Sequence, residues 1–223
     1  MRLIRLRFTK VNRAKYISHL DLNRTFSRAL RRANIPLWYT EGFNPHPYIN
    51  FALPLPLGVE SVNDAMDIKI EGDIPCDEIQ ARLNEVLPDD IKITACDEAV
   101  MQVKDIKNAR YSLLFDGERV SLPELEKRLG GELKAMKKVK SGHKRVIKEV
   151  DITEYVKDYT LTQTEGDILL TITLPAGSSF NISPMLLLDA IFATENTEDN
   201  SNMRYVKNIR RKRLLTEDFE EFR

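Results

Sequence analysis

The residues whose chemistry stands out lie in the stretch SHLDLNRTFSRALRRANIPLWYTEGFNPHP, residues 18–47. It holds four arginines at helical spacings i, i+4, i+7 and i+8, which place them on one helix face: Arg24, Arg28, Arg31 and Arg32. Like charges at these spacings repel each other, and the planar donor fork of arginine suits phosphate. This face therefore predicts a site for phosphate or nucleic acid. Acidic side chains of this chain or of a partner, or plain solvent, are the alternatives.

The nine residues after this helix, YTEGFNPHP, follow neither a helical nor a strand period. Gly42 permits a positive φ, and the proline after His46 favours an extended backbone there. We expect a stiff loop that displays Asn44 and His46 and that extends the arginine site. Aromatic residues beside arginines are used to stack on RNA bases, although for Trp38 we expect a core position instead.

A helix must begin at Ser18 to present these arginines. Ser18 is predicted as the N-cap, with Asp21 at the N3 position of a capping box. We therefore expect Asp21 to stabilise the helix rather than to take part in catalysis. His19 would stand at the first helical position, where the dipole favours a neutral ring, suited to a base or to ordinary packing. Asn34 is predicted to end the helix in a left-handed conformation.

Several enzyme classes lack their motifs here. The sequence has no GxxxxGK[ST], GxGxxG, HExxH or GxSxG pattern. Two cysteines, Cys76 and Cys96, cannot ligate a four-iron cluster alone, and they fit a reducing compartment. His19, Asp21 and His46 could imitate a metal-binding trio, but the capping role of Asp21 argues against it. We expect no cofactor, no metal, no membrane segment and a cytoplasmic location.

The charges are segregated although the net charge is zero. Residues 1–48 contain ten Lys and Arg against two acidic residues, whereas residues 60–98 contain twelve acidic residues against three basic ones. Two later stretches, 134–148 and 204–213, are basic and contain no acid. Such segregation either creates a strong local field or pairs basic with acidic segments inside the molecule. Both interpretations stay open.

The hydrophobic pattern predicts an α+β fold made of two tandem ferredoxin-like (βαββαβ) domains. The first domain, 1–100, carries the HLD and FNPHP motifs, and the second covers 108–223. Expected strands lie at 4–8, 37–39, 48–53, 65–71, 91–95, 110–115, 146–156, 167–174 and 204–209. Expected helices begin at residues 18, 77, 121 and 183, with Ser121 and Glu124 spaced as a capping box.

The segment ISHLDLNRTFSRALRRANIPLWYTEGFNPHPYINFALPLPLGVES resembles the signature of the radical-SAM-linked proteins. This is a bacterial family of unknown function, found alone or fused behind a B12-binding radical SAM enzyme. The similarity extends to LPAGSSFNISPMLLLDAIF and VKNIRRKRLL. It implies that a separate radical SAM protein is the partner that supplies the chemistry, and it assigns no catalytic residues.

These observations favour a non-catalytic module that recognises RNA or another substrate for a radical SAM enzyme. The predicted contacts are Arg24, Arg28, Arg31, Arg32, Asn44 and His46. One alternative is an RNA-processing or RNA-modifying enzyme that uses His19 or His46. Another alternative is a protein-binding scaffold.

Overall fold

The computed structural model describes residues 1–141, 144–177, 180–192 and 202–223. The fold is α+β, as expected, and the chain divides into two compact units. Unit 1 comprises residues 1–106 and 211–223, and unit 2 comprises residues 107–210. The predicted domains, 1–100 and 108–223, differ from these units mainly at the C-terminal end, where residues 211–223 lie with unit 1. None of the described helices is long and apolar enough to cross a membrane.

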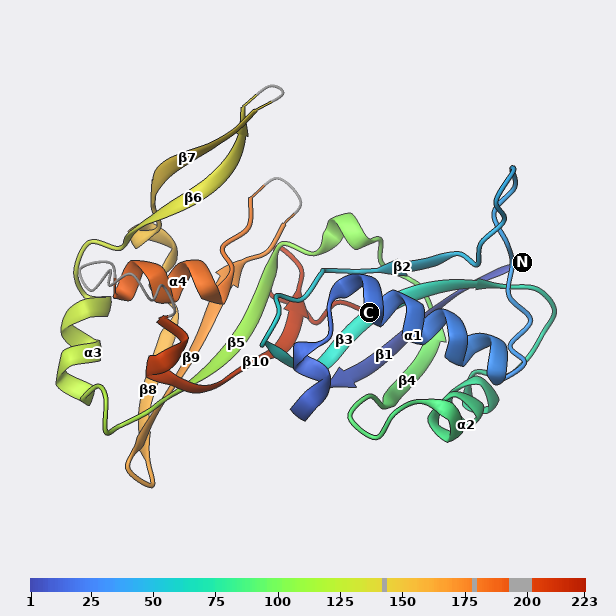
Figure 1. The fold of residues 1–223 in the computed structure, drawn as a ribbon, viewed down its shortest axis with the longest axis horizontal. Coiled ribbons are helices and arrows are strands. Elements are labelled where there is room, and N and C mark those ends of the chain that lie inside the picture. Colours follow the sequence, from blue (N-terminus) through green and yellow to red (C-terminus); the bar gives the residue numbers. More distant parts are fainter. Residues whose placement is uncertain (142–143, 178–179, 193–201) are drawn as a thin grey trace. The chain divides into compact units, whose positions relative to one another are not determined.

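Unit 1 contains a short antiparallel sheet covered by two helices (Figure 1). Its strands are β1 (Arg2–Lys10), β2 (Ile49–Phe51), β3 (Glu60–Ile70) and β4 (Ile93–Glu98), and its helices are α1 (His19–Arg32) and α2 (Cys76–Val86). Strand β1 lies between β4 and β3, and β2 pairs with β3. The expected strand at 37–39 is absent, because Leu37 and Tyr39 form only isolated bridges.

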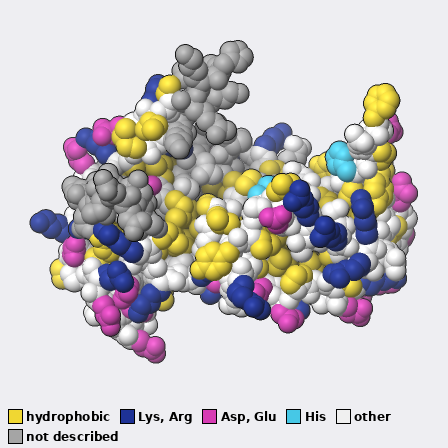
Figure 2. Space-filling model, in the orientation of Figure 1, with side chains coloured by type: hydrophobic (Ala, Val, Ile, Leu, Met, Phe, Trp, Pro, Cys, Tyr) yellow, Lys and Arg dark blue, Asp and Glu magenta, His cyan; other side chains and the backbone are white. Residues whose placement is uncertain are grey.

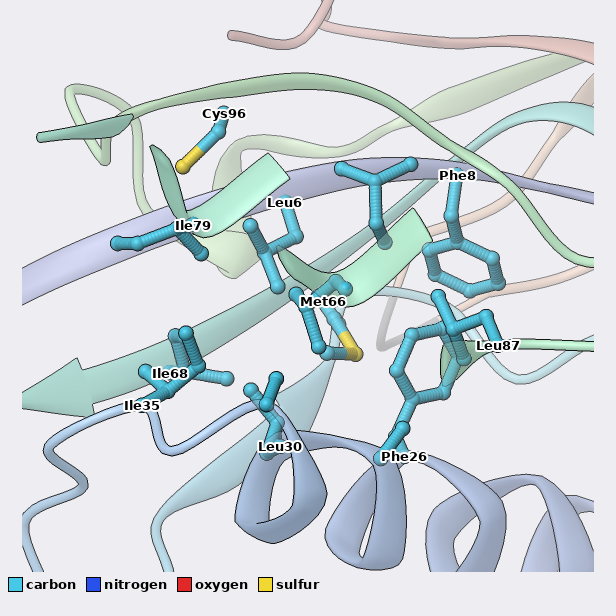
Figure 3. Close-up of a cluster of buried hydrophobic side chains, with 14 of the residues drawn as sticks. Leu6, Phe8, Phe26, Leu30, Ile35, Met66, Ile68, Ile79, Leu87 and Cys96 are labelled. Carbon is cyan, nitrogen blue, oxygen red and sulfur yellow. The ribbon is translucent and has the colours of Figure 1, made fainter. Parts of the chain in front are cut away.

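The core of unit 1 lies between the sheet and the two helices (Figure 3). Leu6 and Phe8 alternate with charged residues along β1, so one face of that strand is apolar and buried. Phe26 and Leu30 lie on one stripe of α1 and are also fully buried. The rings of Phe8 and Phe26 meet edge to face, with centroids 4.9 Å apart. This packing orients α1, so that its opposite face, which carries the arginines, remains exposed.

Helix α1 begins as the sequence predicts. The backbone N–H of Asp21 donates to the Ser18 hydroxyl oxygen at 3.1 Å, and this hydroxyl donates to the Asp21 carboxylate at 2.7 Å. The Ser18 hydroxyl and then Arg24 lower the pKa of Asp21. Asn34 closes the helix with a φ of 51°. Asp21 is therefore engaged in capping, which supports the structural interpretation of this carboxylate.

The Ser18→Ala substitution should cost about 0.5–2 kcal/mol of unfolding free energy, because it removes the N-cap oxygen. It should also move the pKa of Asp21 up toward its usual range, since the hydroxyl donor is removed. Urea denaturation and an NMR titration of the Asp21 carboxyl measure the two effects. Ser27→Ala, inside the same helix, is the control and should not destabilise the protein. Equal behaviour of the two variants would contradict the cap.

Unit 2 contains strands β5 (Asn108–Phe115), β8 (Tyr159–Thr164) and β9 (Asp167–Pro175), together with the start of β10 (Val206–Leu215). They lie in the order β10-β5-β9-β8. Its helices are α3 (Leu122–Leu129) and α4 (Pro184–Ile191). A separate two-stranded sheet consists of β6 (Lys134–Ser141) and β7 (Lys144–Asp151).

The expected strand at 146–156 is confirmed only as far as Asp151. Strand β7 ends at Asp151, whose carboxylate accepts the backbone N–H of Thr153, and a short 3-10 turn follows at Thr153–Tyr155. The sheet strand is β8 instead, joined to β9 by a turn in which Glu165 and Gly166 both have positive φ. The alternation of apolar residues continues past Asp151. Periodicity alone therefore predicts a single strand where β7 ends and the 3-10 turn begins.

Two smaller expectations about unit 2 are also corrected. Ser121 stands at the N-cap of α3, but its side chain makes no capping hydrogen bond. Glu124, the other half of the expected capping box, pairs with Arg128 instead. The last strand begins at Val206, because residues Asn202–Tyr205 form a 3-10 turn.

Candidate anion-binding site

Three of the four predicted arginines line one depression. Arg28, Arg31 and Arg32 surround a concave surface of about 460 Å³ together with Thr25 of α1 and Pro88, which follows α2. All three arginines are exposed. Figure 2 shows dark-blue cationic side chains gathered over the exposed face of α1. The structure therefore brings three of the four predicted arginines together.

Acidic residues in the described part of the chain do not neutralise the charges of these three arginines. In the part of the chain that the structure describes, none of Arg28, Arg31 and Arg32 forms an ion pair. Arg32 donates to the main-chain carbonyl of Val86 at 2.6 Å, which holds its side chain without cancelling its charge. The Arg31 guanidinium lies 5.9 Å from the centroid of the Tyr39 ring. Three positive charges thus face one depression.

Arg24 behaves differently from the other three. Its guanidinium pairs with the Asp21 carboxylate at 3.2 Å, one helical turn away. It does not line the depression. The prediction that Arg24 shares a site with its neighbours is therefore not met by the geometry. The reason is that the carboxylate that caps α1 is also within reach of residue i+3.

Most of the remaining basic residues of segment 1–48 pair with acids, as one of the two interpretations of the charge segregation expects. These residues come from β1 and the turn after it, and their partners come from segment 60–98 and from the last residues of the chain. The pairs are Arg2 with Asp73 and Glu98, Arg5 with Asp67, Arg7 with Glu221, Arg13 with Asp90, and Lys15 with Glu60. The internal-pairing interpretation thus holds for these residues and not for the exposed face of α1.

The FNPHP loop is closed by its own hydrogen bonds. Tyr39 bridges to Pro47, and the Thr40 N–H donates to the His46 carbonyl at 2.9 Å. The His46 Nδ1 lies 3.2 Å from the Asn44 carbonyl oxygen. The Thr40 hydroxyl oxygen lies 3.1 Å from the same nitrogen, so two contacts at Nδ1 hold the ring within the loop.

The side chains at the tip of this loop are exposed. Phe43 is fully accessible to solvent, and Asn44 and His46 are exposed as well. Asn44 and His46 do not line the depression. The loop is connected to the arginine cluster through Tyr39 at its base, which contacts Arg31. The structure therefore brings Arg28, Arg31 and Arg32 together and leaves Asn44 and His46 outside that depression.

The other singled-out residues have ordinary surroundings. His19 is exposed at the first position of α1, and its ring meets the Phe51 ring edge to face at 5.1 Å. Trp38 is half-buried, with the Lys69 ammonium 4.9 Å from its ring centroid, so it is not a fully buried core residue. Among the described residues, no group of three His, Cys, Asp or Glu side chains is placed to hold a metal.

Sequence reasoning missed a group of buried charges in unit 1. Lys10, Asp64 and Arg211 are 1%, 3% and 0% exposed. Asp64 accepts from the Arg211 guanidinium at 2.7 Å and from the Ala65 N–H at 3.0 Å. Burial raises the pKa of Asp64 and lowers that of Lys10, because desolvation penalises the charged forms. Lys10 and Asp64 continue the buried alternation of β1 and β3, and this is the signal that could have revealed them.

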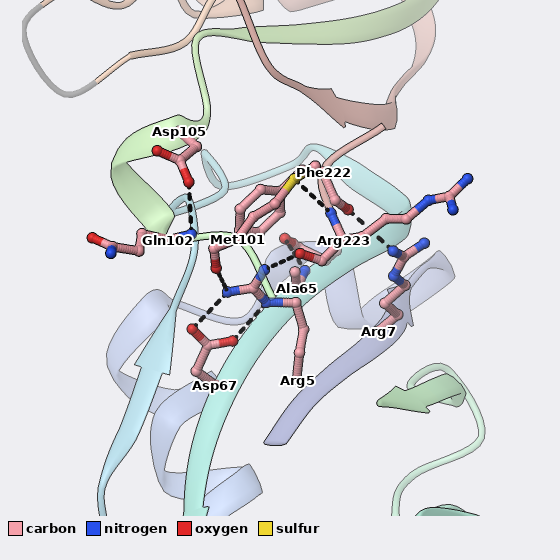
Figure 4. Close-up of polar contacts among 10 residues, drawn as sticks. Arg5, Arg7, Ala65, Asp67, Met101, Gln102, Asp105, Phe222 and Arg223 are labelled. Atoms are coloured by element: carbon pink, nitrogen blue, oxygen red, sulfur yellow. Dashed lines mark hydrogen bonds and ion pairs between the residues drawn. The ribbon is translucent and has the colours of Figure 1, made fainter. Parts of the chain in front are cut away.

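A second buried charge pair lies on the other face of the same strands (Figure 4). Arg5 donates to both carboxylate oxygens of Asp67, at 2.7 and 2.9 Å. It also donates to the main-chain oxygens of Met101 and Arg223. The ring of Phe222 lies 4.0 Å from its guanidinium carbon. Arg5 thus ties the end of the chain to β1, a structural role rather than a ligand-binding one.

The two later basic stretches differ from each other. Stretch 204–213 lies largely in β10, where Lys207 pairs with Asp116 and Asp167, and Arg211 is buried against Asp64. Lys207 and Arg211 are therefore used within the protein, whereas Lys212 and Arg213 of the same stretch are exposed. The described residues of stretch 134–148 lie in β6 and β7, where Lys134 pairs with Glu132 and Lys137 donates to the Asn181 carbonyl, whereas residues 142–143 lie outside the described part of the chain. Lys148 of the same hairpin is exposed.

The comparisons with known proteins identify a family but no activity. No curated protein is significantly similar to this chain. One similar solved structure is described as "Crystal Structure of a Cbf5-Nop10-Gar1 Complex", with 12% sequence identity and a TM-score of 0.49. The match covers 98% of this chain and 50% of that one, so this chain spans half of its length. Similarity at this level identifies no function.

A family model matches residues 3–184, which is most of the 223 residues. The matched region contains α1, the FNPHP loop and all three arginines of the depression. The chain therefore belongs to the family described as "Uncharacterized protein conserved in bacteria (DUF2344)".

Proposed function

We propose that this protein is a non-catalytic recognition module that binds RNA through the phosphates on the exposed face of α1. The observation that carries this proposal is the depression lined by Arg28, Arg31 and Arg32, whose charges have no acidic partner among the described residues. Three guanidinium groups offer many donors in planar forks, which match phosphate oxygens. Counterions released from the phosphates would supply the binding free energy.

The surroundings of the depression favour a polyanion with bases over a small anion. Tyr39 lies against Arg31, and the fully exposed Phe43 lies further along the same loop. An exposed aromatic ring is costly in water and provides a surface on which an unpaired base stacks. The depression is open and shallow, so it suits one segment of a chain whose other parts lie outside it.

A radical SAM enzyme is proposed as the partner, on the strength of the family resemblance of residues 17–61. The support from this chain itself is chemical. The two cysteines of this sequence are insufficient to hold a four-iron cluster, so the cluster for radical chemistry would lie outside these 223 residues. This protein would then position the RNA, and its partner would act on it.

Both units are proposed to be ferredoxin-like. The antiparallel order in unit 1 is β4-β1-β3, with β2 on β3, which corresponds to the 4-1-3-2 order of a βαββαβ unit. In unit 2 the order β10-β5-β9-β8 gives the same arrangement, with the β6–β7 hairpin inserted between α3 and β8. In such a unit the helices pack against the sheet with their apolar sides, so their opposite sides remain free for binding. The arginine-bearing side of α1 is free in this way.

A filter-binding titration against structured bacterial RNA tests the proposed function. The double variant Arg28→Ala/Arg31→Ala should bind more weakly at every salt concentration. The slope of log K against log salt should become shallower by roughly 1.4–1.8, about 0.7–0.9 for each phosphate that the variant no longer binds. Arg32 is left in place because its bond to Val86 also supports the local structure.

The matched control removes two positive charges that are already paired with acids. Arg24→Ala/Arg82→Ala changes the net charge equally, and both residues lie in exposed helical ion pairs. This control should retain nearly all the RNA affinity of the native chain. The proposal fails if the native chain binds no RNA at low salt, or if the two double variants lose affinity equally.

An RNA-processing enzyme is the second candidate, favoured by one observation on His46. The Asn44 carbonyl and the Thr40 hydroxyl both contact Nδ1, so Nε2 of this exposed ring is the nitrogen available to act as a base. RNA that stays intact with the native chain, or is cut equally by His46→Ala, excludes His46 catalysis.

If the arginine face instead binds an acidic protein, a pull-down should recover that protein in the absence of RNA.

A further inference from the structure

The only two cysteines of the chain lie close together in unit 1, although 20 positions separate them. Cys76 is the first residue of α2, and Cys96 lies in β4. Two sets of hydrogen bonds hold these elements side by side in antiparallel directions. Arg2 donates to the Ile74 carbonyl at 3.2 Å and to the Glu98 carboxylate at 3.0 Å. It thus joins the residue two before Cys76 to the residue two after Cys96.

The second set of bonds lies on the other side of the cysteines. The side-chain amide of Gln80, one turn further along α2, donates to the Ile93 carbonyl of β4 at 3.1 Å. Asn84 donates to the same carbonyl at 3.0 Å and accepts the Ile93 N–H at 2.8 Å. Because α2 and β4 are fixed at both ends of the interval, Cys76 and Cys96 face each other within it.

The two thiols differ in their surroundings. Cys96 is buried in the core cluster beside Ile79 (Figure 3). Cys76 is half-buried at the edge of the same cluster. Burial, followed by the neighbouring Cys76 thiol, raises the pKa of the Cys96 thiol. Both cysteines are free thiols in this structure.

We propose that Cys76 and Cys96 form a reversible dithiol–disulfide site, in which Cys76 attacks first and Cys96 resolves the intermediate. Cys76 is the more accessible thiol, because it is half-buried at the first position of α2 whereas Cys96 is buried. Cys96 is sheltered from solvent but within reach of Cys76. Disulfides are rare in reducing compartments except where they are transient or sense redox conditions, and this pair fits that exception.

The reaction partner is a small disulfide of the glutathione class. The Cys76 thiolate attacks one of its sulfur atoms, the S–S bond breaks, and the released thiolate takes up a proton. The Cys96 thiol then gives up its proton and attacks the Cys76 sulfur of the mixed disulfide, which releases the second small thiol. Overall, the protein dithiol loses two electrons and two protons, and the small disulfide is reduced to two thiols.

The site goes beyond the proposed RNA binding and does not rest on it. Incubation of the full-length protein in buffers of increasing oxidised-to-reduced glutathione ratio tests the site directly. Each sample is quenched with an alkylating agent and analysed by intact mass under denaturing conditions. The expected result is a single transition from a doubly alkylated species to an unalkylated one that has lost two hydrogen atoms. The transition should not depend on protein concentration.

Single variants separate the two roles. Cys96→Ser should accumulate a mixed disulfide on Cys76, because the resolving thiol is missing. In Cys76→Ser, the Cys96 thiol should react with the alkylating agent mainly after denaturation, because it is buried. The proposal is overturned if the native chain keeps two alkylatable thiols in fully oxidised glutathione, or forms only disulfides between two chains. The native titration decides this even if a variant fails to fold.

Discussion

Asp64→Ala should lower the free energy of unfolding of unit 1 by about 3–5 kcal/mol, the loss typical of breaking a buried ion pair by removing one partner. Asp64 is 3% exposed and lies between two buried cations, Arg211 and Lys10. Without its carboxylate, the Arg211 guanidinium loses its 2.7 Å partner inside the protein. The Ala65 N–H loses its acceptor as well. These groups have no access to water that would replace the missing bonds.

Urea denaturation followed by tryptophan fluorescence measures this loss. Trp38 is the only tryptophan and lies in unit 1, so its signal reports on that unit even if the two units unfold separately. Asp73→Ala is the control. Its carboxylate also accepts from an arginine, but it is 97% exposed, so the cost should stay below about 1 kcal/mol. A similar small loss for Asp64→Ala would show that water reaches the pair.

The double variant Asp64→Ala/Arg211→Met separates the loss of the pair from the cost of an orphaned charge. Replacing both partners removes the uncompensated guanidinium, and an apolar side chain fills part of its volume. We expect the double variant to be more stable than Asp64→Ala alone. Lys10 remains buried, but it keeps its bond to the Ile17 carbonyl. A double variant that is less stable than the single one would contradict this account.

Local signals predict the elements of unit 1 well. Ser18, Asp21 and Asn34 mark both ends of α1, and the interactions that form these caps lie within a few residues in the sequence. The spacing of Arg28, Arg31 and Arg32 is likewise local, which is why a helical pattern places them on one face. In unit 2, the same local reasoning predicts one continuous strand across Asp151, where β7 ends. The partner of β7 is the basic strand β6, and local alternation does not reveal that pairing.

Long-range register decides which arginines are available to bind a ligand. Arg5 is opposite Asp67 because β1 and β3 pair in the register that sets Leu6 against Met66. A count of charges in residues 1–48 cannot distinguish such a paired arginine from Arg28. Arg211 is hidden for a similar reason, since the basic stretch at 204–213 reads as a ligand-binding surface until β10 places Arg211 against Asp64. The candidate site is therefore smaller than the basic segment that predicts it.

Arg5→Leu should destabilise unit 1 by about 3–5 kcal/mol and should also release the last residues of the chain. Arg5 is 2% exposed and holds both oxygens of Asp67. Its other donors bind the main-chain oxygens of Met101, at 2.8 Å, and Arg223, at 2.6 Å. Leucine fills much of the volume but leaves a buried carboxylate without its partner. The Phe222 ring, whose centroid is 4.0 Å from the guanidinium carbon, also loses its cationic neighbour.

Two measurements distinguish this anchoring role from a general loss of packing. Trp38 fluorescence in urea gives the free energy of unfolding, and limited proteolysis with mass analysis gives the cleavage rate within residues 216–223. Arg7→Leu is the matched control, because Arg7 also contacts this segment but its pair with Glu221 is 3.4 Å long and partly exposed. It should lose about 1 kcal/mol or less.

Arg5→Lys should fall between the two variants in stability. Its ammonium keeps the charge next to Asp67 but lacks the fork that reaches two carboxylate oxygens and two carbonyls together. The contrary outcome is that residues 216–223 resist proteolysis equally in Arg5→Leu and Arg7→Leu. Those residues would then be held by their backbone contacts, such as the Phe222 N–H to the Leu214 carbonyl, and not by Arg5.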